Sequence, residues 1–259
     1  MKQLPLNQCY LTKNDCYKAG RKITPTGIVV HSTGANNPNL CRYVGPDDGV
    51  LGKNKYDNHW NRSGLSKCVH AFIGKVADGT VMAYQTLPWD HRSWGVGSGK
   101  NGSYNNSHIQ FEICEDNLKN ADYYNEAFEV AAMLCAYLCK EYNIPTNNVV
   151  GHYEAHDAGY GSNHGDPRNW QKNHNDSMDA FRARVEKLLA GETVETTQPK
   201  KEAESNVSYT TYTVQKGDSL WRIASKLLGN GNKYKLIQSA NGMNDTLIRA
   251  GQQLKIPKG

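Results

Sequence analysis

The chain of 259 residues lacks a long hydrophobic run. No apolar stretch approaches the roughly 20 residues that a membrane-spanning helix requires, which excludes an integral membrane protein. The first residues, MKQLPLNQCYLTKND, also lack the apolar core of about 7–15 residues that a secretory signal contains. We therefore expect a soluble, globular protein that is made in the cytosol.

Cysteine pairs with metal-binding or redox spacing are also missing. The seven cysteines form no Cys-x-x-Cys motif; they are Cys9, Cys16, Cys41, Cys68, Cys114, Cys135 and Cys139. Their number is odd, whereas a disulfide framework is expected to be even and to occur in a short secreted domain. We predict free, mostly buried thiols in a protein from a reducing compartment.

Large hydrophobic residues are scarce in one short segment that separates two parts of the chain. Residues 191–208, GETVETTQPKKEAESNVS, contain no Leu, Ile, Phe, Tyr or Trp. This composition predicts a flexible linker between a domain at 1–190 and a smaller domain at 209–259. The smaller domain contains eight Lys or Arg and two Asp, a balance of +6 that exceeds the net charge of +5 for the whole chain. A compact basic domain suggests an anionic or polyhydroxylated partner: nucleic acid, an acidic membrane or a cell-wall polymer.

The larger domain alternates strand and helix patterns. Strands are predicted at TGIVVHST, VHAFIGKV, TVMAYQT, HIQFEI and NNVVGH, and helices in ADYYNEAFEVAAMLCAYLCKEYN and SMDAFRARVEKLLAG. In HIQFEI the apolar Ile109, Phe111 and Ile113 share one face, and the polar residues share the other. The pattern predicts an α/β domain with a mixed central sheet flanked by helices.

The smaller domain reads as strand, helix, helix, strand (βααβ), with the strands at YTV and QLKIP and the helices at DSLWRIASKLL and KYKLIQSAN. Its predicted core consists of Val214, Leu220, Ile223, Ala224, Leu227, Ile237, Leu254 and Ile256. In so small a domain, packing of the helices against the two strands must supply most of the stability.

Two histidines end predicted buried strands, His31 after Ile28-Val29-Val30 and His152 after Val149-Val150-Gly151. Taken singly, each is better explained as a hydrogen-bonded structural histidine. Together with a third candidate cluster at 163–166, NHGD, they suggest a zinc site, since catalytic zinc takes three protein ligands and leaves one position open. The spacing of 121 residues is no local metal motif.

Glu112 lies on the polar face of its strand. It is a solvated carboxylate unless that face looks toward the zinc, in which case it becomes a general base for water. A cysteine nucleophile is the competing hypothesis, with Cys68 beside His70 or Cys114 beside Glu112, although neither spacing orients the groups well.

Residues 209–257 resemble a LysM module in YTVQKGDSLWRIA, in the Asn-Gly after the second helix and in GQQLKIP. The resemblance implies binding of N-acetylglucosamine-containing glycans by a shallow groove. The residues that it implicates are Gly217, Asp218, Ser219, Asn241 and Gly242.

Residues 22–190 resemble the zinc-dependent N-acetylmuramoyl-L-alanine amidases, the group of T7-type lysozymes and peptidoglycan recognition proteins, in IVVHSTG, HIQFEICED, VVGHYEAH and SNHGDPRNW. The resemblance implies Zn²⁺ held by His31, His152 and Asp166, with Glu112 as general base and His164 as oxyanion stabiliser. The longer segment before Asp166 leaves His164 as an alternative third ligand. Where many relatives have Trp-His-Ala-Gly, this chain has Trp94-Gly95-Val96-Gly97, without the histidine.

The two resemblances together imply a peptidoglycan hydrolase with a wall-binding module. HIQFEICED and SNHGD are similar to members from clostridial-type Gram-positive hosts and their prophages, which implies an endolysin that stays cytoplasmic until release. A secreted autolysin is the alternative origin, and a non-catalytic peptidoglycan recognition protein is the alternative function. We expect neither a nucleic-acid partner nor membrane insertion.

Overall fold

The computed structural model describes residues 3–191, 209–215, 218–229, 233–241, 243, 248–249 and 251–257. The chain forms two compact units, Met1–Thr196 and Thr197–Gly259. The predicted linker at 191–208 falls, from residue 192 onward, outside the described residues, as do Gly217 and Gly242. In the part of the chain that is described, no helix is both long and apolar enough to span a membrane.

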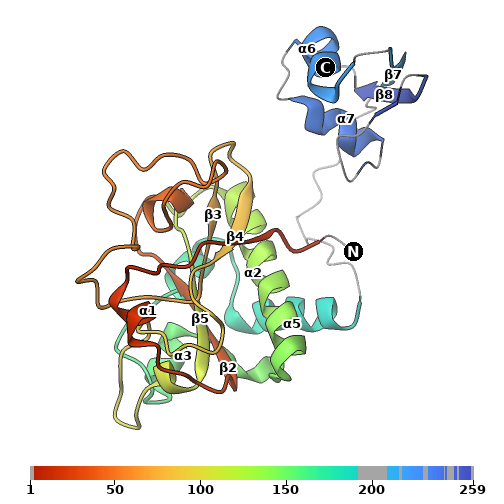
Figure 1. Cartoon of the computed structure of the whole chain (residues 1–259). Coiled ribbons are helices and arrows are strands. Elements are labelled where there is room, and N and C mark those ends of the chain that lie inside the picture. Colours follow the sequence, from red (N-terminus) through yellow and green to blue (C-terminus); the bar gives the residue numbers. More distant parts are fainter. Residues whose placement is uncertain are drawn as a thin grey trace. The chain divides into compact units, whose positions relative to one another are not determined.

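The first unit is built on a six-stranded, mainly parallel sheet (Figure 1). Its strands are β1 (Leu6–Gln8), β2 (Gly27–Ser32), β3 (Ala71–Lys75), β4 (Val81–Gln85), β5 (His108–Ile113) and β6 (Val149–Gly151). They lie in the order β1-β4-β3-β5-β2-β6, and only β3 and β4 pair in antiparallel fashion. The predicted mixed sheet flanked by helices is confirmed.

Helices α2 (Ala121–Tyr142) and α5 (Met178–Leu189) lie side by side against the sheet (Figure 1). Helix α2 begins where the Asn120 side chain accepts a hydrogen bond from the Tyr123 N–H, and it ends at Asn143 in the left-handed conformation. Its apolar stripe and the inner faces of β2 and β5 form the main core. As the alternation in HIQFEI predicts, Ile109, Phe111 and Ile113 belong to that core.

The first unit also contains three shorter helices. They are α1 (Asp15–Ala19), α3 (His152–Asp157) and α4 (Arg168–Asn173), with single 3₁₀ turns at Leu40–Arg42, Tyr104–Asn106 and Thr146–Asn148. Helix α3 starts directly after β6, so His152 is the first residue of a helix, where the sequence predicts the end of a strand.

The prediction of free thiols is wrong for two cysteines. Cys16 of α1 and Cys68, which precedes β3, form a disulfide across 52 residues. The other five are free. An odd number of cysteines does not exclude one bridge, because two of the seven can pair wherever the fold brings their Cβ atoms together in a suitable orientation.

The second unit contains β7 (Tyr209–Thr213), α6 (Leu220–Leu228), α7 (Tyr234–Ala240) and β8 (Gln253–Pro257), in the predicted βααβ order. Strands β7 and β8 pair in antiparallel fashion. Seven of the eight predicted core residues are buried together. Leu227 is the exception, with 42% of its surface exposed, because it lies on the outer side of α6.

Candidate metal centre and active site

The register of two neighbouring strands places His31 beside Glu112. Strands β2 and β5 run parallel with these two residues as partners, so both side chains point to the same face of the sheet. Strand β2 is buried along its whole length between β5 and β6, which makes it a rigid support for His31.

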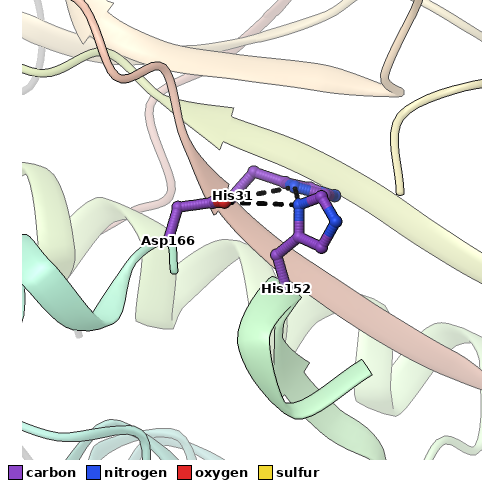
Figure 2. A group of neighbouring side chains, drawn as sticks. All are labelled: His31, His152 and Asp166. Carbon is purple, nitrogen blue, oxygen red and sulfur yellow. Dashed lines mark hydrogen bonds and ion pairs between the residues drawn. The ribbon is translucent and has the colours of Figure 1, made fainter. Parts of the chain in front are cut away.

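Two further segments bring His152 and Asp166 to the same point (Figure 2). The His31 and His152 Nδ1 atoms lie 3.0 Å apart, the His31 Nδ1 lies 3.2 Å from Asp166 Oδ2, and the His152 Nδ1 lies 3.3 Å from Asp166 Oδ1. Among the described residues this is the one group of His, Cys, Asp and Glu side chains with metal-binding geometry.

These distances fit a tetrahedral metal ion. Ligands at 2.0–2.1 Å from zinc stand about 3.3–3.4 Å apart along the edges of a tetrahedron. Two imidazole nitrogens and a carboxylate are also the donor types that catalytic zinc takes, with one position left open. His164 stacks on His152, with ring centroids 4.6 Å apart, but is not part of the converging group. The geometry therefore favours Asp166 over His164 as third ligand.

Hydrogen bonds hold the three candidate ligands in place. The Ser32 N–H donates to Asp166 Oδ2. Glu154, in the first turn of α3, accepts from the Gly151 N–H and pairs with Arg182 of α5 at 2.9 Å, which anchors the helix that begins with His152. Burial by itself raises the pKa of Asp166, but the neighbouring His152 and His31 side chains outweigh it and hold the pKa well below its usual range.

An amide relay fixes the ring orientation of His31. The Asn105 Oδ1 accepts from the backbone N–H groups of Gly95 and Val96, and it also accepts from Gln110 Nε2 at 2.8 Å. The side-chain amide oxygen of Gln110, Oε1, therefore faces His31 Nε2 at 3.1 Å. Since that oxygen can only accept, His31 carries its proton on Nε2 and presents the Nδ1 lone pair to a metal.

The same relay accounts for the missing histidine in Trp94-Gly95-Val96-Gly97. A Cβ atom on Gly95 would lie 2.5 Å from the Gln110 Oε1 and 2.9 Å from a methyl group of Val69. A side chain at position 95 would displace the amide that orients His31.

The candidate ligands line a cavity of about 540 Å³. Glu112 also lines it, and the Glu112 Oε2 is buried with no hydrogen-bond partner among the described residues. Burial raises the pKa of Glu112 well above its ordinary value, and the nearby Asp166 and Glu115 carboxylates raise it further. A buried carboxyl whose pKa is raised and that faces a candidate metal site is suited to general acid–base chemistry.

Sequence reasoning missed a second acid, Glu115. It lines the cavity, accepts a short hydrogen bond from the Ser32 hydroxyl and has a pKa that burial raises. Lys67 and Trp60 lie on the cavity wall as well, with the Lys67 ammonium 4.9 Å from the Trp60 ring centre. Glu115 follows Glu112 by three residues, but it lies beyond the end of β5, so strand alternation could not predict its direction.

The structure argues against a cysteine nucleophile. Cys68 is part of the disulfide, and neither Cys68 nor His70 lies in β3. Burial raises the pKa of the Cys114 thiol well above its ordinary value, which suppresses the reactive thiolate. His70 is buried between the Gln110 N–H and the His91 carbonyl, and burial lowers its pKa to about 4.

In the second unit, the described candidates for glycan binding have their side chains engaged internally. The Asp218 Oδ2 accepts from the Tyr212 hydroxyl and the Gln215 N–H, and Ser219 caps α6. The Asn241 side chain donates to the Ile237 and Lys255 carbonyls and accepts from the Lys255 N–H. These side chains therefore shape the turns of the second unit.

Comparison with known proteins gives two family matches. The profile of the N-acetylmuramoyl-L-alanine amidases matches residues 20–169, and that of the LysM domain matches residues 212–257. Among curated proteins, the chain is 46% identical over 70 residues to N-acetylmuramoyl-L-alanine amidase CwlH of Bacillus subtilis (strain 168). This match covers 27% of the chain and 26% of the relative, so the chain spans about a quarter of the length of that protein.

Solved structures share the fold. The Staphylococcus aureus hydrolase AmiA, in complex with its ligand, is 24% identical with a TM-score of 0.51, over 73% of this chain and 85% of that one. The PlyG catalytic domain is 23% identical with a TM-score of 0.50, over 77% of this chain and 100% of that one. Because the amidase profile spans more than half of the 259 residues, the chain belongs to the N-acetylmuramoyl-L-alanine amidase family.

Proposed function

We propose that this protein hydrolyses the amide bond that joins the lactyl group of N-acetylmuramic acid to L-alanine in bacterial peptidoglycan. The observation that carries the proposal is the convergence of His31, His152 and Asp166 in the cavity that also receives the unpartnered Glu112 oxygen. The amidase profile and the curated relative support the choice of this bond.

The donor set fits zinc, held by the two Nδ1 atoms and the Asp166 carboxylate. When bound, zinc lowers the pKa of water and polarises a carbonyl. Glu112 takes the proton of the attacking water and delivers it to the leaving amine of alanine. His164, at the cavity wall, donates a hydrogen bond to the oxygen on which negative charge develops.

The second unit is proposed to bind N-acetylglucosamine-containing glycan strands, with the groove formed around Gly217, Asp218, Ser219, Asn241 and Gly242. The LysM match supports this assignment. The domain boundaries of 1–190, 191–208 and 209–259 remain part of the proposal. We also propose that the protein is a phage or prophage endolysin of a clostridial-type host and stays cytoplasmic until release. This origin rests on the motifs HIQFEICED and SNHGD alone.

Mass spectrometry of digested Gram-positive walls tests the bond. We expect products with a free N-terminal alanine, whereas new reducing sugar ends would assign the enzyme to another class. No product at all, with walls still bound, would indicate the non-catalytic recognition protein.

The Glu112→Gln variant tests the proposed general base. We expect turnover to fall by at least about 10²–10³-fold, the usual cost of losing one group of the catalytic apparatus. Circular dichroism should show an intact fold, and Glu186→Gln on the exposed side of α5 is the matched control. Near-full activity of Glu112→Gln would remove Glu112 from the mechanism.

A further inference from the structure

A single serine hydroxyl connects two histidines of the cavity. The Ser162 Oγ lies 3.2 Å from His152 Nε2, 3.0 Å from His164 Nδ1 and 3.1 Å from the Val96 carbonyl oxygen. The motif SNHGDPRNW begins at Ser162, but no role for this residue follows from the sequence.

The proton of this hydroxyl can go to one neighbour only. A carbonyl oxygen never donates, so if the hydroxyl proton pointed at a ring nitrogen, the Ser162 and Val96 oxygens would face each other as two acceptors at 3.1 Å. Donation to Val96 avoids that repulsion. The Ser162 oxygen then offers its two lone pairs to the rings, and both ring nitrogens must carry hydrogen.

The backbone around the hydroxyl is fitted to this arrangement. The Ser162 N–H also donates to the Val96 carbonyl, at 2.9 Å, so the two segments are joined by a pair of bonds. Gly97 has a positive φ of 69°, and a Cβ atom there would lie 2.7 Å from the Ser162 Oγ. The glycine is therefore needed for the close approach of the two loops.

We infer that Ser162 is a positioning residue that sets the tautomer of His152 and the ring orientation of His164. This inference deepens the proposed function and rests on it. With hydrogen on Nε2, His152 presents the Nδ1 lone pair to His31 and Asp166, as a metal ligand must. With its Nδ1 held by the Ser162 hydroxyl, the His164 ring has Nε2 on the side away from that hydroxyl.

Nitrogen-15 NMR of the imidazole rings in the metal-free full chain tests the tautomers directly. We expect a hydrogen on His152 Nε2 and a hydrogen on His164 Nδ1 in the wild type, whatever the other ring nitrogens carry without the metal, and only partial occupancy of both positions in Ser162→Ala. A wild-type His164 protonated only on Nε2 would overturn the inference. This readout needs neither metal nor substrate, so it stands even if the proposed hydrolysis is not found.

Metal affinity gives a second, independent readout. Competition with a chelating dye, using Zn²⁺ alone, should show binding that is about 10–100-fold weaker in Ser162→Ala, the usual effect of removing a partner of a metal-ligating histidine. Ser107→Ala is the matched control. The Ser107 hydroxyl also contacts a histidine, with 2.9 Å between its Oγ and His108 Nδ1, but this pair does not line the cavity. Unchanged zinc affinity in Ser162→Ala would contradict the inference, even if the wild type cleaves peptidoglycan as proposed.

Discussion

The two units of this protein bury different kinds of side chain. The first unit buries a cluster of polar groups around its cavity, among them His31, Gln110, Glu115 and His152. The described residues of the second unit bury hydrophobic side chains only. Burying polar groups costs free energy unless each has a partner, and only a unit with a large apolar core elsewhere can tolerate that cost. The difference indicates chemistry inside the first unit and binding at the surface of the second.

Metal removal should give the largest difference between the two units, because it should abolish hydrolysis by the first unit and leave wall binding unchanged. We expect EDTA to reduce the release of dye from labelled walls by at least about 10³-fold, because the substrate carbonyl and the water lose their activating charge. Sedimentation with walls should show unchanged binding, and added Zn²⁺ should restore hydrolysis. Hydrolysis that persists after dialysis against EDTA would contradict the assignment of His31, His152 and Asp166 as a catalytic metal site.

Core truncation should affect the units unequally. Ile73 of β3 and Ile223 of α6 are both fully or almost fully buried, and replacing either with Ala should cost about 2–5 kcal/mol. We expect this loss to unfold the small second unit in Ile223→Ala but only to lower the melting temperature of the first unit in Ile73→Ala. Calorimetry of the two variants measures both transitions. If the second unit stays folded in Ile223→Ala as the first unit does in Ile73→Ala, the small unit has more stability than its size predicts.

Removal of the second unit should affect only insoluble substrate. A chain that ends at residue 191 should hydrolyse intact walls about 10–100-fold more slowly, because it loses the local concentration that a second binding module provides. The rate on a short, soluble muropeptide should not change. A slower reaction on the soluble substrate would mean that the second unit contributes to the first unit's chemistry.

The smallest expected effect concerns stability. Because burial and the Asp166 and Glu115 carboxylates raise the pKa of Glu112, its contribution to stability is fully present below the unfolded pKa near 4.5 and is lost as the pH rises through the folded pKa. Glu112→Gln should therefore stabilise the metal-free protein at pH 8 by about 1–2 kcal/mol. Urea unfolding at pH 8 and pH 4.5 measures this gain, which should shrink at the lower pH. A destabilised variant at pH 8 would mean that Glu112 is not in an unfavourable environment.

Local patterns predict the elements that support the site. Alternation in HIQFEI places Glu112 opposite the apolar face, and the buried run before His31 predicts its strand, because each pattern reflects the repeat of one element. The pairing of Cys16 with Cys68, the inward direction of Glu115 and the hydroxyl of Ser162 could not be predicted. Each depends on contacts between segments that are far apart in the chain.

The sequence by itself therefore determined the class of the protein: an α/β unit with a histidine at or just after the end of each of two buried strands, a short segment with few apolar residues, and a basic βααβ unit. The tertiary structure decided which side chains meet. It placed His31 beside Glu112 through strand register, and it brought Asp166 rather than His164 within reach of both histidine Nδ1 atoms. Hydrophobic periodicity is a property of neighbouring residues, whereas a metal site depends on distances of a few ångströms between segments that only the packed core brings together.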